Sequence, residues 1–209
     1  SNFSFYYAHH ISTIEGGMIC TDDMELSQQL IMCRAHGWDR NIDHSEQQIL
    51  RKKHKVNDFY AKYTFYDLGF NVRSTDINGF IGNLQLNYWD EIVDKRHKNF
   101  IAINNVIEAN DELISIECNN MEIVSSFAIP VIAKNKSILK KYTKLFNNSG
   151  VEIRPMVAGN MSKQPFYRKY ISNPGVQKNA DFVHNHSFYF GNHADLSTEE
   201  IEKLLSLLL

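Results

Sequence analysis

Residues 1–23 read SNFSFYYAHHISTIEGGMICTDD, and this stretch has the layout of two short strands that lead into a helix. The apolar and aromatic run Phe3–Tyr7 is typical of a strand, and Gly17–Thr21 fits a second one. Asp22 or Asp23 can then cap a helix, because a carboxylate accepts hydrogen bonds from the first backbone N–H groups. Since Phe3–Tyr7 has the character of a strand inside a domain, we expect the chain to be part of a longer protein.

The middle of the chain is predicted to contain a long polar segment followed by two helices. Residues 41–65 are rich in Lys, His, Asp and Gln and lack clear periodicity, which indicates loop with short helix. Ser74 or Thr75 can cap a helix that reaches about Tyr88. A longer helix is expected over residues 90–110.

The C-terminal half alternates strands and helices. Strand candidates at 123–133 and 152–157 flank a predicted helix over 136–148, which Gly150 ends. Ser197-Thr198-Glu199-Glu200 is a capping box ahead of an amphipathic final helix. We therefore expect an α/β fold with a small layered domain at the C-terminal end.

The composition argues against several classes of protein. The chain has 209 residues, of which 43% are hydrophobic, and 22 basic against 24 acidic residues leave a net charge of −2. With this balance of charges the chain has no excess of positive charge to attract nucleic acid, so nucleic acid is not an expected partner. No apolar stretch is long enough to cross a bilayer, so we expect a cytoplasmic protein without a membrane partner. The three cysteines lack the close spacing of a zinc or iron–sulfur ligand set, so no metal is expected.

Three motifs resemble the DegT/DnrJ/EryC1/StrS sugar aminotransferase family, in the family's order. Residues 1–23 resemble the segment in which Ser-Phe is followed by the cofactor lysine and then by Glu-Gly-Gly. DLGFNVRSTDINGFIGNLQL (67–86) resembles the Leu-Gly-Phe/Tyr-Asn-x-Arg motif with its helix, and GVEIRPMVAGNMSKQP (150–165) resembles the Gly-Ile/Val-Glu-x-Arg-Pro segment. The resemblance implies a fold type I, aspartate aminotransferase-like structure. Residues 1–95 would belong to the large cofactor-binding domain, and 96–209 would form the small C-terminal domain.

The chain departs from the family at the lysine position. Counting back six residues from Glu15 places His9, rather than His10, where the family has its lysine. Within the family, this histidine resembles that of sugar 3-dehydratases, one acting on a GDP-linked and another on a CDP-linked sugar. The CDP-type enzyme has cluster-binding cysteines just after this segment. RAHGWDR (34–40) has no cysteine and resembles the GDP-sugar type.

The resemblance implies removal of the C3 hydroxyl of GDP-4-keto-6-deoxy-D-mannose, in deoxysugar and O-antigen biosynthesis. The implied cofactor is pyridoxal 5′-phosphate, used in its pyridoxamine 5′-phosphate form and regenerated by L-glutamate. Histidine cannot anchor this cofactor covalently, but an ordinary pKa of about 6.5 lets it accept and donate protons near neutral pH. His9 is therefore the expected catalytic acid and base, although an ordinary polar role beside a strand is the alternative.

The resemblance also assigns further site residues. Ser4 would contact the cofactor phosphate, and Asn71 would reach the same phosphate from the neighbouring subunit of a homodimer. His36 and Trp38 are candidates for contacting the sugar or completing the partner's site. The alternative is that Trp38 is a core residue and His36 an ordinary surface histidine. Arg154 would bind a phosphate or the glutamate carboxylate, or form only a surface ion pair.

Two other hypotheses about function stay open. The chain could be a catalytically silent relative that serves as a dimerisation or binding module. An ordinary aminotransferase would need a lysine near the cofactor, and none lies in residues 1–51.

A metal site at the His9–His10 pair is disfavoured, because neighbouring strand side chains point to opposite faces. The family's other cofactor contacts lie upstream of these motifs, so we expect activity in the whole protein and not in this chain alone.

Overall fold

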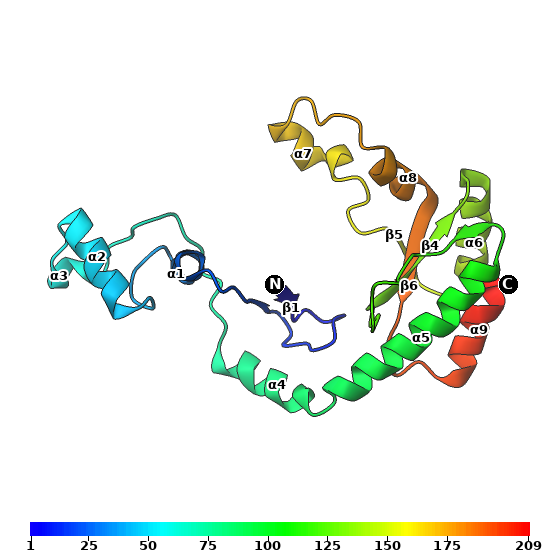
Figure 1. Cartoon of the computed structure of the whole chain (residues 1–209), viewed down its shortest axis with the longest axis horizontal. Helices are drawn as coiled ribbons and strands as arrows, with labels where there is room; N and C mark the ends of the chain where they lie inside the picture. Colours follow the sequence, from blue (N-terminus) through cyan, green and yellow to red (C-terminus); the bar gives the residue numbers. More distant parts are fainter. The chain divides into compact units, whose positions relative to one another are not determined.

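The computed structural model describes residues 1–209 and divides them into two compact units, Ser1–Asn87 and Tyr88–Leu209. Figure 1 draws the first unit in blue to cyan-green and the second in green to red. The domain boundary expected at residue 95 falls inside α5 (Trp89–Ala109), a continuous helix that lies wholly in the second unit. None of the helices has the length and apolar character needed to cross a membrane.

The first unit combines a small hairpin with four helices. β1 (Asn2–Ser4) pairs antiparallel with β2 (Gly17–Ile19), with Phe3 opposite Met18. β1 is shorter than the predicted Phe3–Tyr7 strand, because the chain turns after Ser4. The helices are α1 (Met24–Cys33), α2 (His44–His54), α3 (Asp58–Ala61) and α4 (Asp76–Leu86).

The predicted capping residues begin two of these helices. At the start of α1, Asp23 Oδ1 accepts a hydrogen bond from the backbone N–H of Leu26 at 3.0 Å. Thr75 and Asn78 form a capping box at α4, in which Asn78 Oδ1 accepts from Thr75 N at 2.9 Å. Each such cap contributes about 1 kcal/mol to the stability of its helix.

The polar region 41–65 is more helical than its sequence predicts. Helix α2 covers 11 residues of it and carries no buried side chain, so no apolar stripe marks the helix in the sequence. The prediction of loop with short helix therefore did not locate the helix at residues 44–54. Arg51, Lys52, Lys53 and His54 occupy the last turn, where positive charge suits the helix dipole.

The second unit is built on a four-stranded antiparallel sheet with the order β3-β4-β6-β5. The strands are β3 (Leu113–Ile114), β4 (Ala128–Ala133), β5 (Ile153–Pro155) and β6 (Ser187–Gly191). β6 pairs with β4 over five residues, from Ala128–Gly191 to Ile132–Ser187, whereas β3 pairs only with Ile132 and Ala133. The sequence patterns predicted β4 and β5 but missed β6, which follows α8 (Lys178–His186) without an intervening turn residue.

The remaining helices of this unit are α6 (Lys136–Asn148), α7 (Pro165–Tyr170) and α9 (Thr198–Leu208), with a single 3₁₀ turn η1 (Met161–Lys163). α6 matches its predicted range, and Gly150 follows it with a left-handed φ of 72°. The capping box of α9 is present: Ser197 N donates to Glu200 Oε2 at 2.8 Å, and Glu200 N donates to Ser197 Oγ at 3.2 Å.

One hydrophobic core holds the second unit together. Alternate β4 residues, Ile129, Val131 and Ala133, are buried, as the two-residue period of a strand requires. Phe146 of α6 is fully buried, with its ring centroid 5.2 Å from that of Phe188 and 5.3 Å from that of Phe190. Residues of α5 and α9 complete the core: Phe100, Ile103, Ile107, Leu204 and Leu208.

Candidate functional site

A tight turn after β1 places His9 beside Ser4. The backbone N–H of His9 donates to Tyr6 O at 3.0 Å, and the backbone N–H of Tyr6 donates to Ser4 Oγ at 3.3 Å. Ser4 Oγ and His9 Nδ1 lie 3.4 Å apart, and which of them donates depends on the imidazole tautomer. Ser4 is exposed and His9 is half-buried. The residues predicted for phosphate contact and proton transfer are thus neighbours.

Two polar side chains of α4 hold the loop that follows His9. Asn78 Nδ2 donates to Thr13 O at 2.9 Å, and Gln85 Oε1 accepts from Ser12 N at 2.9 Å. Gln85 Nε2 also donates to Ser12 O. The sequence analysis did not identify Asn78 or Gln85 as part of the site, although their spacing of two turns puts them on one face of a helix in the second family motif. These contacts join the first and second motifs.

Close backbone approach explains the glycine pair of the first motif. A Cβ on Gly16 would lie 2.4 Å from Thr13 Oγ1, and a Cβ on Gly17 would lie 3.0 Å from Phe3 O. Both distances are shorter than ordinary van der Waals contact, so a side chain at either position would require the Thr13 hydroxyl or the Phe3 carbonyl to move. This geometry agrees with the expectation that Glu15-Gly16-Gly17 shapes the turn into β2.

A second cluster forms where the RAHGWDR segment turns back on itself. The ring centroids of His36 and Trp38 lie 4.7 Å apart, and the Arg40 guanidinium lies 3.8 Å from the Trp38 ring centroid. Arg73 approaches the same ring at 5.6 Å. We call the residues His36, Trp38, Arg40, Asn71 and Arg73 the turn cluster. Arg40 and Arg73 were not among the predicted site residues.

Glycine allows the turn to lie against the segment that carries Asn71. Gly37 has a φ of 79°, and a Cβ there would lie 1.9 Å from Asp67 O. His36 N donates to Phe70 O at 2.7 Å, and Ala35 forms an isolated bridge with Asn71. Three predicted residues, His36, Trp38 and Asn71, are therefore brought together by backbone contacts.

The Asn71 carboxamide is oriented by its own neighbour. Arg73 Nε donates to Asn71 Oδ1 at 3.1 Å, so the NH₂ end of the amide is the end able to donate to an anion. Asn71 is exposed. This orientation suits contact with a phosphate oxygen outside the segment.

Arg154 lies in the second unit, in an exposed ion pair. Its Nη2 is 2.7 Å from Glu152 Oε1, and the Arg154 side chain is 65% exposed. The hydrogen bond and charge of Glu152 raise the pKa of Arg154. The structure thus pairs this predicted anion-binding residue with a carboxylate on its own strand region, and such exposed pairs are weak enough to exchange partners.

The chemistry of the donors fits a phosphate-bearing cofactor that is not covalently anchored. A serine hydroxyl and an asparagine amide are neutral donors suited to phosphate oxygens. His9 offers an imidazole at the position that the resemblance assigns to the anchoring lysine, and residues 1–51 contain no lysine. No group of three His, Cys, Asp or Glu side chains could hold a metal ion.

Comparison with known proteins finds several similar sugar-modifying enzymes. A GDP-4-keto-6-deoxy-D-mannose 3-dehydratase from Yersinia pseudotuberculosis is 31% identical over 210 residues, which cover 99% of this chain and 52% of the relative. A solved variant of GDP-4-keto-6-deoxymannose 3-dehydratase with bound GDP-perosamine matches with a TM-score of 0.80 at 31% identity. Another, with a trapped PLP–glutamate geminal diamine, has a TM-score of 0.80 at 32% identity. Both matches cover 100% of this chain and 54% of the solved chain.

The chain spans about half the length of the curated relatives it matches. The solved structures give its fold as part of an α/β, fold type I, pyridoxal phosphate-dependent transferase, which confirms the fold predicted from the motifs. Residues 1–208 match the family model described as the DegT/DnrJ/EryC1/StrS aminotransferase family. The chain therefore belongs to the DegT/DnrJ/EryC1/StrS aminotransferase family.

Proposed function

We propose that the whole protein carrying this chain is a vitamin B6-dependent dehydratase that removes the C3 hydroxyl of GDP-4-keto-6-deoxy-D-mannose. The observation that carries the proposal is His9 beside Ser4, at the position that the resemblance in residues 1–23 assigns to the family's lysine. The names of the Yersinia pseudotuberculosis and Escherichia coli relatives, 31% and 33% identical, support the same reaction. The product would be a 3,6-dideoxy-4-keto sugar of the kind used in O-antigens.

Ser4 and Asn71 are the residues of this chain that would hold the cofactor phosphate. When bound, pyridoxal 5′-phosphate in its amine form supplies an amino group for the 4-keto carbon and a conjugated ring that accepts electrons. Ser4 would donate its single hydroxyl proton to a phosphate oxygen, and Asn71 would donate from its NH₂ end. A solved relative carries a trapped PLP–glutamate adduct, which supports a phosphate-bearing cofactor of this kind.

His9 would move the protons of the elimination. If the Ser4 hydroxyl proton goes to the phosphate, Ser4 Oγ can accept a hydrogen bond from His9 Nδ1 across the 3.4 Å that separates them. That tautomer leaves the lone pair on Nε2, so Nε2 is the atom that accepts a proton and then returns it to the departing hydroxyl. Because histidine forms no covalent bond to the cofactor, the deoxygenated sugar can leave without amino transfer.

The turn cluster and Arg154 would serve the remaining ligands. His36 and Trp38 offer an imidazole and an aromatic face to the sugar or to the partner's site, and Arg40 and Arg73 add positive charge beside them. Arg154 would exchange Glu152 for a phosphate or for the carboxylate of L-glutamate, the proposed amino donor. The PLP–glutamate adduct of a solved relative supports glutamate in that role.

We further propose a homodimer in which Asn71 reaches the neighbour's cofactor. The segment around Asn71 exposes apolar side chains, with Leu68 92% exposed and Phe70 and Val72 more than half exposed. Such a patch beside a polar donor is typical of a surface that another chain covers. The same exposure would arise if the rest of this protein covered the segment, and the complementation experiment below separates the two.

The reaction itself can be tested with the whole protein. Incubation with pyridoxal phosphate, L-glutamate and GDP-4-keto-6-deoxy-D-mannose is expected to yield a sugar nucleotide in which hydrogen replaces the C3 hydroxyl, detected by mass spectrometry as the net loss of one oxygen atom. Omitting glutamate should stop the reaction after the amine form is spent. An amino sugar as the product would identify an aminotransferase, and unchanged substrate would identify a binding or dimerisation module.

The proposal that Asn71 contributes to the neighbouring subunit's site can be tested separately. Asn71→Ala should weaken cofactor binding by about 10- to 100-fold, the usual effect of losing a hydrogen bond to a charged group. Mixed dimers of Asn71→Ala and His9→Asn subunits should regain activity, because one site in each would combine an intact His9 with the partner's Asn71. If both residues serve the same subunit's site, no mixture will exceed the activity of the two variants measured separately, and the dimer proposal is then wrong.

A further inference from the structure

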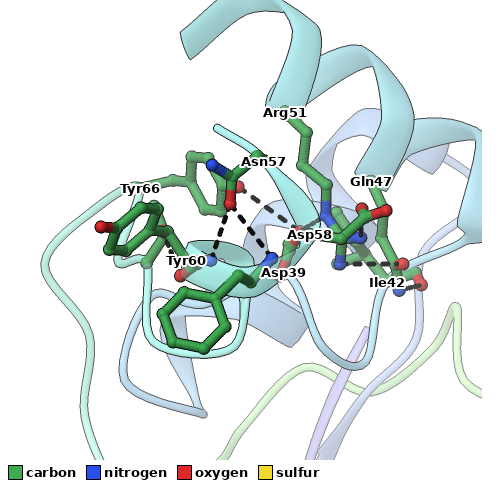
Figure 2. Close-up of polar contacts among 10 residues, drawn as sticks. Asp39, Ile42, Gln47, Arg51, Asn57, Asp58, Tyr60 and Tyr66 are labelled. Carbon is green, nitrogen blue, oxygen red and sulfur yellow. Dashed lines mark hydrogen bonds and ion pairs between the residues drawn. The ribbon is translucent and has the colours of Figure 1, made fainter. Parts of the chain in front are cut away.

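Asp39 is a buried carboxylate in the middle of the turn cluster. Its side chain is 0% exposed, and its Oδ2 lies 2.7 Å from Arg51 Nε of helix α2. Tyr66 OH donates to the same oxygen at 3.5 Å, and Oδ1 is buried without a hydrogen bond inside the chain. Figure 2 shows Arg51 reaching from its helix to Asp39, with Asp58 and Gln47 beside it.

Arg51 is the main compensation for this buried charge. A carboxylate removed from water is strongly unfavourable unless a cation and hydrogen bonds replace its hydration. The other acid near Arg51, Asp58, lies 3.4 Å away and is 94% exposed, so solvent screens it. The hydrogen bond that Arg51 donates to Asp39 raises the pKa of Arg51, and burial raises the pKa of Tyr66. The Asp39–Arg51 pair therefore needs both partners in place.

The Asp39–Arg51 pair connects the turn cluster to helix α2. In the sequence Asp39 stands between Trp38, which is half-buried, and Arg40, which is exposed and stacks on the Trp38 ring, while Arg51 belongs to α2. On the other side, Tyr66 N donates to Gly37 O at 2.8 Å. His36 has a φ of 63°, a backbone conformation that a residue with a Cβ keeps only when its surroundings impose it. The buried Asp39–Arg51 pair is one of the contacts that impose this conformation.

We propose that Asp39 is a positioning residue, whose ion pair with Arg51 fixes the turn that presents His36 and Trp38 to the substrate. This inference rests on the proposed function, because it assigns the purpose of the pair to the substrate contacts of that turn. Asp39 is buried away from solvent and acts only through its neighbours. Its loss should therefore affect catalysis through the geometry of residues 34–42.

The first test is Asp39→Asn in the whole protein. The amide keeps the shape and can still accept from Arg51 Nε, but it leaves the guanidinium without its counter-charge. Hydrogen exchange in peptides covering residues 34–42 should become faster, and kcat/KM should fall by about 10- to 100-fold, the usual cost of a misplaced site group. A His36→Ala variant should show a comparable loss, and adding Asp39→Asn to it should cause little further loss, because both act through one segment.

Graded variants keep the test valid if Asp39→Asn does not fold. Arg51→Lys retains the positive charge but loses the planar donor geometry, so it should give an intermediate effect on both exchange and kcat/KM. Tyr66→Phe removes only the contact at 3.5 Å and should stay close to the parent. As a matched control, Asp94→Asn removes the acid of the exposed Asp94–Lys98 pair, whose side chains lie 2.6 Å apart, and should change neither measurement.

Two outcomes separate this inference from the proposed function. If His9→Asn abolishes turnover while Asp39→Asn and Arg51→Lys leave kcat/KM at the parent value, the positioning role is wrong and the dehydratase proposal stands. Faster exchange without any kinetic loss would likewise overturn the positioning role. If His9→Asn retains the parent rate, the proposed function itself has failed, and the positioning role falls with it.

Discussion

Replacing His9 with Asn in the whole protein should slow removal of the C3 hydroxyl by about 10²- to 10⁴-fold, the range typical of a lost general acid and base. Asn retains a hydrogen-bonding group that can face Ser4, but it has no group that titrates near neutral pH. Cofactor binding should persist, because the proposed phosphate contacts are Ser4 and Asn71. Single-turnover product formation and cofactor absorbance measure the two effects separately.

His10→Asn is the matched control, since His10 is adjacent and also half-buried. We expect it to keep nearly the parent rate. His9→Lys should allow covalent attachment of the cofactor, visible as a change in its absorption and as an adduct trapped by borohydride, and should divert turnover towards amino transfer. An Asn variant that eliminates the hydroxyl at the parent rate would show that His9 is not the base.

Replacing Phe146 with Ala should lower the free energy of unfolding of the second unit by about 3–5 kcal/mol, the usual cost of emptying a buried aromatic site. The side chain is fully buried, and its ring packs against both Phe188 and Phe190 of β6. Helix α6 would therefore lose its main contact with the sheet. Hydrogen exchange of the β4 and β6 amides should accelerate accordingly, because their protection reports the opening of this unit.

Phe166→Ala provides the comparison within the same unit. Phe166 lies on α7 and is 56% exposed, so its removal leaves no cavity and should change stability little. Equal destabilisation by the two variants would contradict the assignment of Phe146 to the centre of the core.

Local sequence predicts the ends of elements better than it predicts their partners. Asp23, Thr75 and Ser197 begin helices as expected, because a cap forms between residues only two or three apart. β6 was missed although it pairs with both β4 and β5. Its pairing depends on residues far along the chain, and no turn residue separates it from α8.

The residues of the candidate site also fall into two groups, those that local sequence predicts and those that depend on distant contacts. His9 and Ser4 belong to one motif, so a resemblance over residues 1–23 was enough to predict both. Asn78 and Gln85 contact the His9 loop from residues more than sixty positions away, and Asp39 meets Arg51 across a polar helix that shows no apolar period. Such contacts follow from tertiary packing, which neither spacing nor composition records.

The short outer strands of the sheet also bear on the behaviour of the protein at high concentration. β3 covers only two residues of β4, and β5 ends at Pro155, which has no backbone N–H to offer. Pro130 interrupts the N–H groups of β4 in the stretch that β3 leaves uncovered. An extended segment from another molecule therefore finds no long row of donors to pair with, and the sheet is protected against edge-to-edge aggregation.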